Sequence, residues 1–243
     1  MSDKEKHFIL IIDGDEEMAN PITLHLEEKK TYVEVEKCGS GNRQGREYVS
    51  GEFLDGKLVA CGGWSHANRK ECSVTGKEGS YTFNTSSRHS AFATKLNESM
   101  LWITGGFDED EVITNSTEFV TVNSSVPGPF MNITLADHCV VKINESFILM
   151  IGGDAKDYGK QNKTWFVDLK NGFKMVEGPQ MNNVRSCSAC GKKLDDTENT
   201  IVIAAGGIDE ATVEFLNMTN ISNWIADKSY HVYQYTFASS YKN

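Results

Sequence analysis

Short apolar runs that end in a pair of glycines recur along the chain. Four copies are strong, and a weaker copy at residues 8–14 opens the sequence. The last glycine of each copy is Gly14, Gly63, Gly106, Gly153 or Gly207. These positions are 49, 43, 47 and 54 residues apart, and self-similarity at such a period is typical of proteins built from stacked repeats. The pattern therefore predicts a repeat architecture.

Each period contains three further strand-like stretches around the glycine-ended run. One precedes it, at residues 48–53, 90–96, 138–143 and 187–194, and short turns rich in Asp, Asn and Glu join the two. Turn residues between two apolar segments are typical of β-hairpins. A third strand and an edge-like fourth strand follow a polar loop, and no helical stretch of useful length occurs. Four short strands per period predict one blade of an all-β propeller.

The paired glycines are expected to serve the repeat itself. Glycine is favoured where a strand ends in a sharp turn and a neighbouring backbone approaches closely. The glycines assigned this structural role are Gly14, Gly62, Gly63, Gly105, Gly106, Gly152, Gly153, Gly206 and Gly207.

These runs resemble the kelch repeat family, whose pattern is four apolar residues, Gly-Gly, and a spaced Tyr and Trp. Val59-Ala-Cys-Gly-Gly-Trp64 and Trp102-Ile-Thr-Gly-Gly-Phe107 match it well, and so does the run that ends at Gly207. The resemblance covers roughly residues 8–226. Asp13 replaces the first glycine of the opening copy. The resemblance implies a kelch-type β-propeller of four-stranded blades.

Five glycine-ended runs predict about five blades, whereas six or seven are usual in the family. Residues 230–237 alternate like a strand and are expected to supply the missing inner strand of the first blade, which would join the ends of the ring. An incomplete ring, or a fragment of a longer propeller, is the preferred alternative. The expected domain is a single propeller over residues 8–237, with tails at 1–7 and 238–243.

Charge and hydropathy narrow the range of partners. Lys+Arg 24 against Asp+Glu 34 gives a net charge of −10. An acidic chain is a poor partner for nucleic acid or an anionic membrane. No apolar run is longer than that of residues 8–12, which is far shorter than the ~20 residues of a membrane span.

The compartment stays open. The charged start of the sequence lacks the apolar stretch of a secretory signal, which indicates a cytoplasmic chain. Nine Asn-x-Ser/Thr sites instead indicate an extracellular glycoprotein, represented here by a fragment. These possible N-glycosylation sites are Asn84, Asn97, Asn115, Asn123, Asn132, Asn144, Asn162, Asn217 and Asn220.

Six cysteines permit three disulfides without requiring them. Cys187-Ser-Ala-Cys190 is a lone Cys-x-x-Cys, and residues three apart on a strand point to opposite faces. No second pair accompanies it, and no His-x-x-x-His occurs, so no metal and no cofactor are expected. His89 and His138 are interpreted as structural residues that share one position of the repeat.

The loops that follow the glycine pairs are the expected binding surface, because propellers present such loops from a rigid scaffold. The candidate partner-binding residues are Trp64, His66, Arg69, Phe107, Asp108 and Tyr158. Asp108 opens an acidic run, residues 108–111, interpreted mainly as a solvated loop tip, with a calcium site or a contact with a basic partner as the alternative.

The leading functional hypothesis is a non-catalytic module that binds another protein or a glycan through these rim loops. An extracellular glycoprotein module in recognition is one alternative. The other is an enzyme at the propeller axis, such as a kelch-type oxidase or isomerase. It requires convergent polar groups with perturbed pKa values around a cavity. No set of two histidines, two tyrosines and a cysteine, which the related copper oxidases need, is recognised in the sequence.

Overall fold

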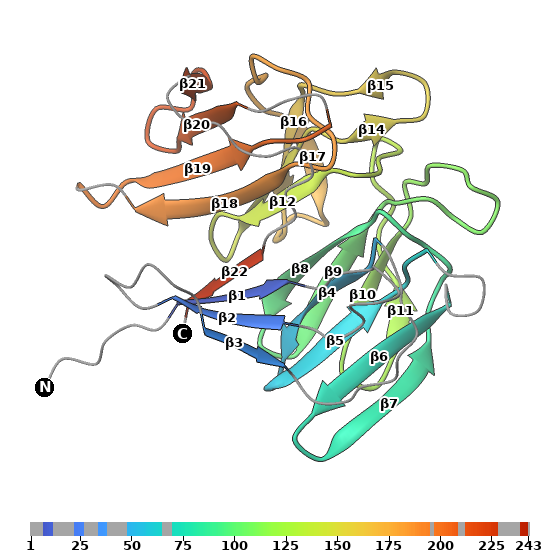
Figure 1. Cartoon of the computed structure of the whole chain (residues 1–243). Coiled ribbons are helices and arrows are strands. Elements are labelled where there is room, and N and C mark those ends of the chain that lie inside the picture. The colour runs from blue at the N-terminus through green and yellow to red at the C-terminus, as the bar shows by residue number, and fades with distance from the viewer. Residues whose placement is uncertain are drawn as a thin grey trace, which may run out of the picture.

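All regular secondary structure in the described residues is β-strand, which confirms the all-β prediction. The structure is a computed structural model, and it describes residues 7–11, 22–26, 34–37, 48–64, 70–194, 197–208, 212–227 and 239–242. The described strands form five four-stranded antiparallel sheets and one two-stranded hairpin, β14 (Asp154–Ala155) and β15 (Gly159–Lys160) (Figure 1).

Sheets 2 to 5 follow one another along the chain. Within each sheet the strands lie side by side in the order in which they occur in the sequence. Sheet 2 contains β4 (Ser50–Leu54), β5 (Lys57–Cys61), β6 (Glu71–Gly76) and β7 (Gly79–Asn84). Sheet 3 contains β8 (Phe92–Asn97), β9 (Met100–Thr104), β10 (Thr117–Val120) and β11 (Ser125–Pro127). Sheet 4 contains β12 (Cys139–Lys142), β13 (Phe147–Ile151), β16 (Thr164–Asp168) and β17 (Lys174–Glu177). Sheet 5 contains β18 (Ala189–Leu194), β19 (Thr200–Ala205), β20 (Val213–Asn217) and β21 (Ile225–Asp227).

Sheet 1 combines the two ends of the described chain. Its strands, in spatial order, are β22 (Ser239–Lys242), β1 (His7–Ile11), β2 (Ile22–Leu26) and β3 (Glu34–Lys37). The strand that pairs with β1 was expected at 230–237, which lies outside the described residues. The structure instead pairs residues 239–242, expected to be a tail, with His7 opposite Lys242. Alternation identifies residues able to form a strand but does not choose between neighbouring stretches of the same pattern.

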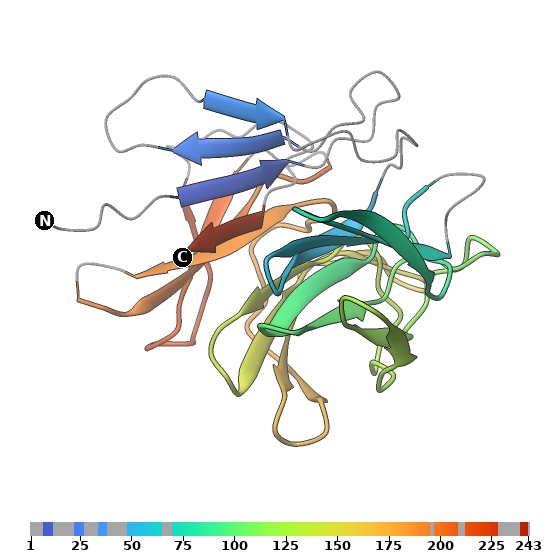
Figure 2. The same cartoon turned by 90° about the horizontal axis from the view of Figure 1, so that it is seen from below.

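The first strands of successive sheets lie beside one another. β8 lies against β4 and β12, and β18 lies against β12 and β22. Figure 2 shows β22 next to the strands of sheet 5, in agreement with the contact between β18 and β22. Repeated sheets joined in this way fit a β-propeller-like architecture.

The core consists of apolar layers between neighbouring sheets. In β9, Leu101 and Ile103 belong to the cluster shared with sheet 2, whereas Trp102 belongs to the cluster shared with sheet 4. β13 alternates in the same way between the clusters toward sheets 3 and 5. Because successive side chains of a strand point to opposite faces, a strand covered on both faces must be apolar throughout. This explains the continuous apolar runs before the glycines.

In three of the four described pairs, the second glycine binds the segment that crosses into the next sheet. The N–H groups of Gly63, Gly106 and Gly153 donate to the carbonyls of Arg88, Leu135 and Arg185 over 2.9, 2.8 and 2.7 Å. The first glycine has a φ of 58° to 68° in all four described pairs, and the second has a φ of 92° to 126°. A Cβ on Gly105 would lie closer than 3.0 Å to the carbonyl oxygen of Leu135. Backbone geometry and close approach therefore both require glycine at this junction.

Two buried ion pairs reinforce these crossings. Arg185 Nη2 lies 3.0 Å from Glu214 Oε1, and both side chains are fully buried. The same arginine donates to the carbonyls of Gly206 and Thr212. Such pairs persist in the interior only when further hydrogen bonds satisfy both partners. Arg185 thereby fixes the C-terminal end of the glycine-ended run of sheet 5, at Gly206.

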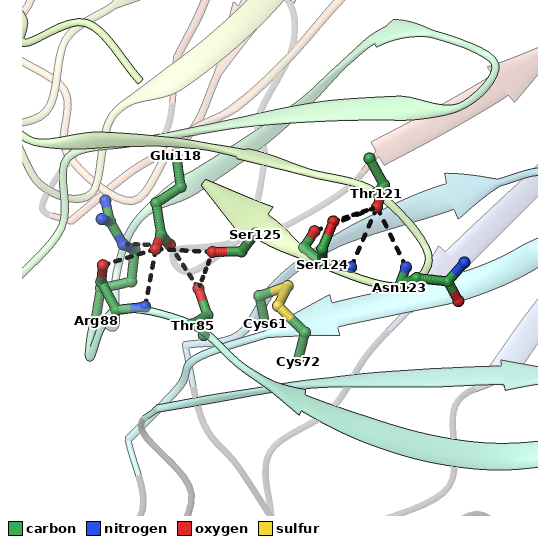
Figure 3. The surroundings of a disulfide bond; sticks show 10 residues. Cys61, Cys72, Thr85, Arg88, Glu118, Thr121, Asn123, Ser124 and Ser125 are labelled. Atoms are coloured by element: carbon green, nitrogen blue, oxygen red, sulfur yellow. Dashed lines mark hydrogen bonds and ion pairs between the residues drawn. A yellow bond between two sulfur atoms is a disulfide. The ribbon is translucent and has the colours of Figure 1, made fainter. Parts of the chain in front are cut away.

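Sheet 3 repeats this arrangement with Arg88 and Glu118 (Figure 3). Burial alone would raise the pKa of Glu118, but hydrogen bonds from Ser86 and Thr85, together with the charge of Arg88, outweigh it and lower that pKa. In sheet 4 the equivalent positions are Leu135 and Trp165, which are buried in the apolar cluster. Apolar packing thus replaces one ion pair of the repeat.

The described residues contain two disulfides, which answers part of the question that six cysteines leave open. Cys61–Cys72 joins β5 to β6 within sheet 2 (Figure 3). Cys139–Cys190 joins the first strands of sheets 4 and 5 across 51 residues of sequence. A loop of that length corresponds to about 4 kcal/mol of stabilisation in the chain-entropy treatment. Since Cys190 is oxidised, the Cys-x-x-Cys motif does not form a metal-binding pair of thiols.

We predict that Gly105→Ala destabilises the fold by about 3 kcal/mol or more, because its Cβ would collide with the Leu135 carbonyl. Gly172→Ala is the matched control. Its φ of 63° is close to the 58° of Gly105, but no atom lies within 4 Å of the added Cβ, so about 1–2 kcal/mol is expected. Urea unfolding measures both. Equal losses would show that close approach at the junction is unimportant.

Candidate functional site

Four residues at equivalent positions carry a left-handed backbone and link the sheets at one end. Tyr48, Ser90, Asp137 and Cys187 each lie two residues before the first strand of a sheet, with φ values of 57°, 52°, 51° and 55°. Backbone hydrogen bonds join these residues in a row. The N–H of Ser90 donates to the carbonyl of Tyr48 at 3.1 Å, that of Asp137 to Ser90 at 2.9 Å, and that of Cys187 to Asp137 at 2.8 Å. We name these four residues the inner line. Non-glycine residues adopt this conformation only where surrounding contacts enforce it.

An aromatic cluster lies beside the inner line, formed by Tyr48, Trp64, His89 and Phe107. The His89 ring stacks on Phe107 at 4.9 Å and 11°, and Trp64 meets the His89 ring edge-on at 4.9 Å. Tyr48 lies 6.3 Å from the same ring. Trp64 is 40% exposed and Tyr48 48% exposed, while His89 is buried. Loops of sheets 2 and 3 thus present an aromatic surface to solvent over a buried imidazole.

The loop of residues 107–113 is held in place by its own hydrogen bonds. Phe107 and His89 exchange backbone hydrogen bonds of 2.9 and 3.2 Å. Asp108 Oδ1 accepts the N–H groups of Asp110 and Val112, both at 3.0 Å. His89 Nε2 lies 3.0 Å from Glu111 Oε2. The carboxylate of Asp108, expected to bind a partner, therefore orders its own loop.

Lys70, which directly precedes β6 of sheet 2, pairs with Glu109 of this loop. The side chains of both residues are well exposed, so the ion pair is worth little energy, but it spans the junction between the two sheets. Asp110 and Glu111 are also exposed. The rim beside the aromatic cluster is therefore acidic.

Two perturbed groups of the inner line meet next to this cluster. Burial raises the pKa of Asp137, although hydrogen bonds with Cys187 and Ser90 oppose that shift. Burial and the neighbouring Asp137 carboxylate raise the pKa of the Cys187 thiol to about 12. A thiol with this pKa stays protonated at neutral pH and is a poor nucleophile. Cys187 therefore acts as a hydrogen-bond partner rather than a reactive thiolate.

The candidate residues from the sequence fall into three groups. Trp64 and Phe107 come together in the aromatic cluster. Tyr158 lies at the tip of the β14–β15 hairpin and is 77% exposed. His66, Arg69 and Gly14 lie outside the described residues. Among the residues that the structure describes, no group of three or more His, Cys, Asp or Glu side chains is placed to hold a metal ion.

The sequence pattern assigns His89 to the wrong position of the repeat. The expectation that His89 and His138 share a repeat position is wrong, because His89 precedes β8 by three residues and His138 precedes β12 by one. His89 belongs to the aromatic cluster, whereas His138 is buried between sheets 3 and 4 beside Phe92. The equivalent positions of these two sheets are Ser90 and Asp137, which each lie two residues before the first strand.

The comparisons with known proteins support the fold alone. No family model matches the chain, and no curated protein matches it. A solved structure titled "Structure of YjhT" is similar, with a TM-score of 0.68 and 11% sequence identity over 84% of this chain and 76% of that chain. The class defined here is an all-β protein of repeated four-stranded sheets with a propeller-like arrangement. No described helix is long and apolar enough to cross a membrane.

We predict that His138 makes folding sensitive to acid. Its Nε2 lies 2.8 Å from Thr104 Oγ1, its Nδ1 has no hydrogen-bond partner among the described residues, and burial lowers its pKa to about 3. Between this value and the ordinary pKa of 6.5, the unfolded chain therefore binds a proton on this imidazole that the folded chain does not bind. The free energy of unfolding should fall as pH decreases from 6.5 toward 3, by about 1.4 kcal/mol per pH unit at most.

His138→Gln removes the titrating group and keeps a side chain able to bond Thr104. The slope of unfolding free energy against pH is measured by urea unfolding between pH 6.5 and 4. It should become shallower by up to about 1.4 kcal/mol per pH unit, which is the contribution of one proton. His138→Met serves as a second variant if the glutamine form is unstable. An unchanged slope in a folded variant would contradict a neutral, buried His138.

Proposed function

We propose that this chain is a kelch-type β-propeller of five four-stranded blades and acts as a non-catalytic recognition module. Five four-stranded sheets, adjacent first strands and glycine pairs at every described junction support the blade assignment. The pairing of β22 with β1 supports a ring whose two ends share one blade. The kelch resemblance of the glycine-ended runs supports the family.

The aromatic cluster is the observation that carries the recognition role. Tyr48 and Trp64 expose large rings, and the buried His89 and the ordered 107–113 loop fix the surface beneath them. Rigid aromatic side chains at a surface are frequent anchors of binding interfaces, because they contribute contact area at little entropic cost. The partner, a protein or a glycan, would place an apolar ring or C–H surface on Trp64.

The acidic rim adds a second requirement on the partner. Glu109, Asp110 and Glu111 are exposed in the loop next to Phe107, and Lys70 pairs with Glu109. Hydroxyl, amide or ammonium donors are therefore favoured over phosphate or carboxylate groups. This agrees with the net charge of −10.

An extracellular placement is the second candidate, and the disulfides favour it. Cys61–Cys72 and Cys139–Cys190 are typical of oxidising compartments, where structural disulfides persist. An enzyme at the axis draws support from Ser90 and Asp137 on the inner line, but the protonated Cys187 offers it no nucleophile.

We predict that Trp64 reports ligand binding. The other three tryptophans, Trp102, Trp165 and Trp224, are buried, so ligand-dependent fluorescence change should come from Trp64. The titration uses a panel of neutral and amino sugars and of basic peptides. For any ligand that binds, Trp64→Ala or Phe107→Ala should weaken affinity by roughly 30-fold, the loss expected of an aromatic anchor.

Val176→Ala is the matched control. Val176 is exposed on β17, the edge strand of sheet 4, whereas the aromatic cluster is formed by sheets 2 and 3. It should leave affinity unchanged, and calorimetry measures all variants without relying on fluorescence. Binding that survives both Trp64→Ala and Phe107→Ala would exclude the aromatic cluster as the recognition surface.

A further inference from the structure

The nine possible glycosylation sites are not equivalent in the structure. β8 leads away from Ser90 to Asn97, and β9 returns to Gly105, so Asn97 lies at the far end of the sheet from the aromatic cluster. Asn144 occupies the same turn of sheet 4, between β12 and β13. We name this end, defined by Asn97 and Asn144, the hairpin-tip face. Both asparagines are exposed.

The amides of these two residues share one geometry. Asn97 Oδ1 accepts the N–H of Ser99 at 2.9 Å. Asn144 Oδ1 accepts the N–H of Ser146 at 2.8 Å and of Phe147 at 3.0 Å. In both, the oxygen binds the N–H of the acceptor motif's own serine and fixes the side chain in a tight Asx turn. The Nδ2 atom, which is the atom that a glycan modifies, is left facing away from these contacts.

Asn115 and Asn162 have the opposite arrangement. Their Nδ2 atoms donate to the carbonyls of Met131 and Met181 at 3.0 and 3.1 Å. Their own carbonyls accept the N–H groups of the same methionines at 2.9 and 2.8 Å. Both methionine side chains are buried. A sugar on either Nδ2 would have to occupy space that this reciprocal pairing closes, so these motifs serve the repeat.

We propose that the chain is N-glycosylated at Asn97 and Asn144 and that Asn115 and Asn162 remain unmodified. The donor would be an oligosaccharide joined through pyrophosphate to a lipid carrier. Nδ2 forms a bond to the anomeric carbon, the carbon–oxygen bond to pyrophosphate breaks with its electron pair leaving on that oxygen, and Nδ2 loses one proton. The inference rests on the extracellular placement of the proposed function. Glycans at the hairpin-tip face would leave the aromatic cluster open.

The test is the occupancy of each site in the full chain isolated from its native source. Peptide-N-glycosidase treatment in ¹⁸O water converts each glycosylated asparagine to labelled aspartate, which peptide mass spectrometry locates. We expect label at Asn97 and Asn144 and none at Asn115 or Asn162. Label at Asn115 or Asn162, or bare Asn97 and Asn144, would overturn the proposal.

Two matched variants separate modification from folding. Asn97→Gln should remove one glycan and destabilise the fold only slightly, since the turn bond to Ser99 that it loses is exposed. Asn115→Gln should leave the glycan mass unchanged and destabilise the fold more, by losing its part-buried bond to Met131. A lower glycan mass in Asn115→Gln would contradict the inference. A bare chain that still binds ligand through Trp64 would overturn this inference while leaving the recognition role intact.

Discussion

The hydrogen bond from the second glycine of a pair to the crossing segment, present at Gly63, Gly106 and Gly153, is the contact on which the rest of the structure depends. It joins the end of one sheet's second strand to the carbonyl that precedes the next sheet's first strand. No side chain fits between the two backbones, so the junction fixes both their separation and their orientation. The sheets can then pack closely enough to bury the apolar residues on both faces of β9 and β13.

The proposed recognition surface follows from the same junctions. The crossing that binds Gly63 through Arg88 continues into His89, which pairs with Phe107 directly after the next glycine pair. Trp64, one residue beyond Gly63, thereby reaches the same imidazole from the neighbouring sheet. The same junctions that join the sheets therefore also bring two loops from different repeats together. Since glycine pairs recur, each junction offers such a position, but only this one is occupied by three aromatic rings in the described residues.

The sequence was informative where a pattern repeats and uninformative where a single pairing decides. Periodic apolar runs located the second strand of sheets 2 to 5, and the paired glycines marked the junctions, because packing and backbone geometry leave few alternatives there. The partner of β1 could not be found by alternation, since pairing is decided by chain path. The left-handed backbone of Tyr48, Ser90, Asp137 and Cys187 left no mark, because these residues share no side-chain chemistry. Nor did the repeat reveal that Leu135 and Trp165 replace an ion pair.

Native-state hydrogen exchange of the glycine amides tests the central claim most directly. If the junctions hold the sheets together, the amides of Gly63, Gly106 and Gly153 should exchange only through opening events whose free energy approaches that of global unfolding. Amides in the exposed turn at Gly172 should exchange far faster. Junction amides that exchange as fast as this turn would show that the sheets are not held together through their glycine pairs.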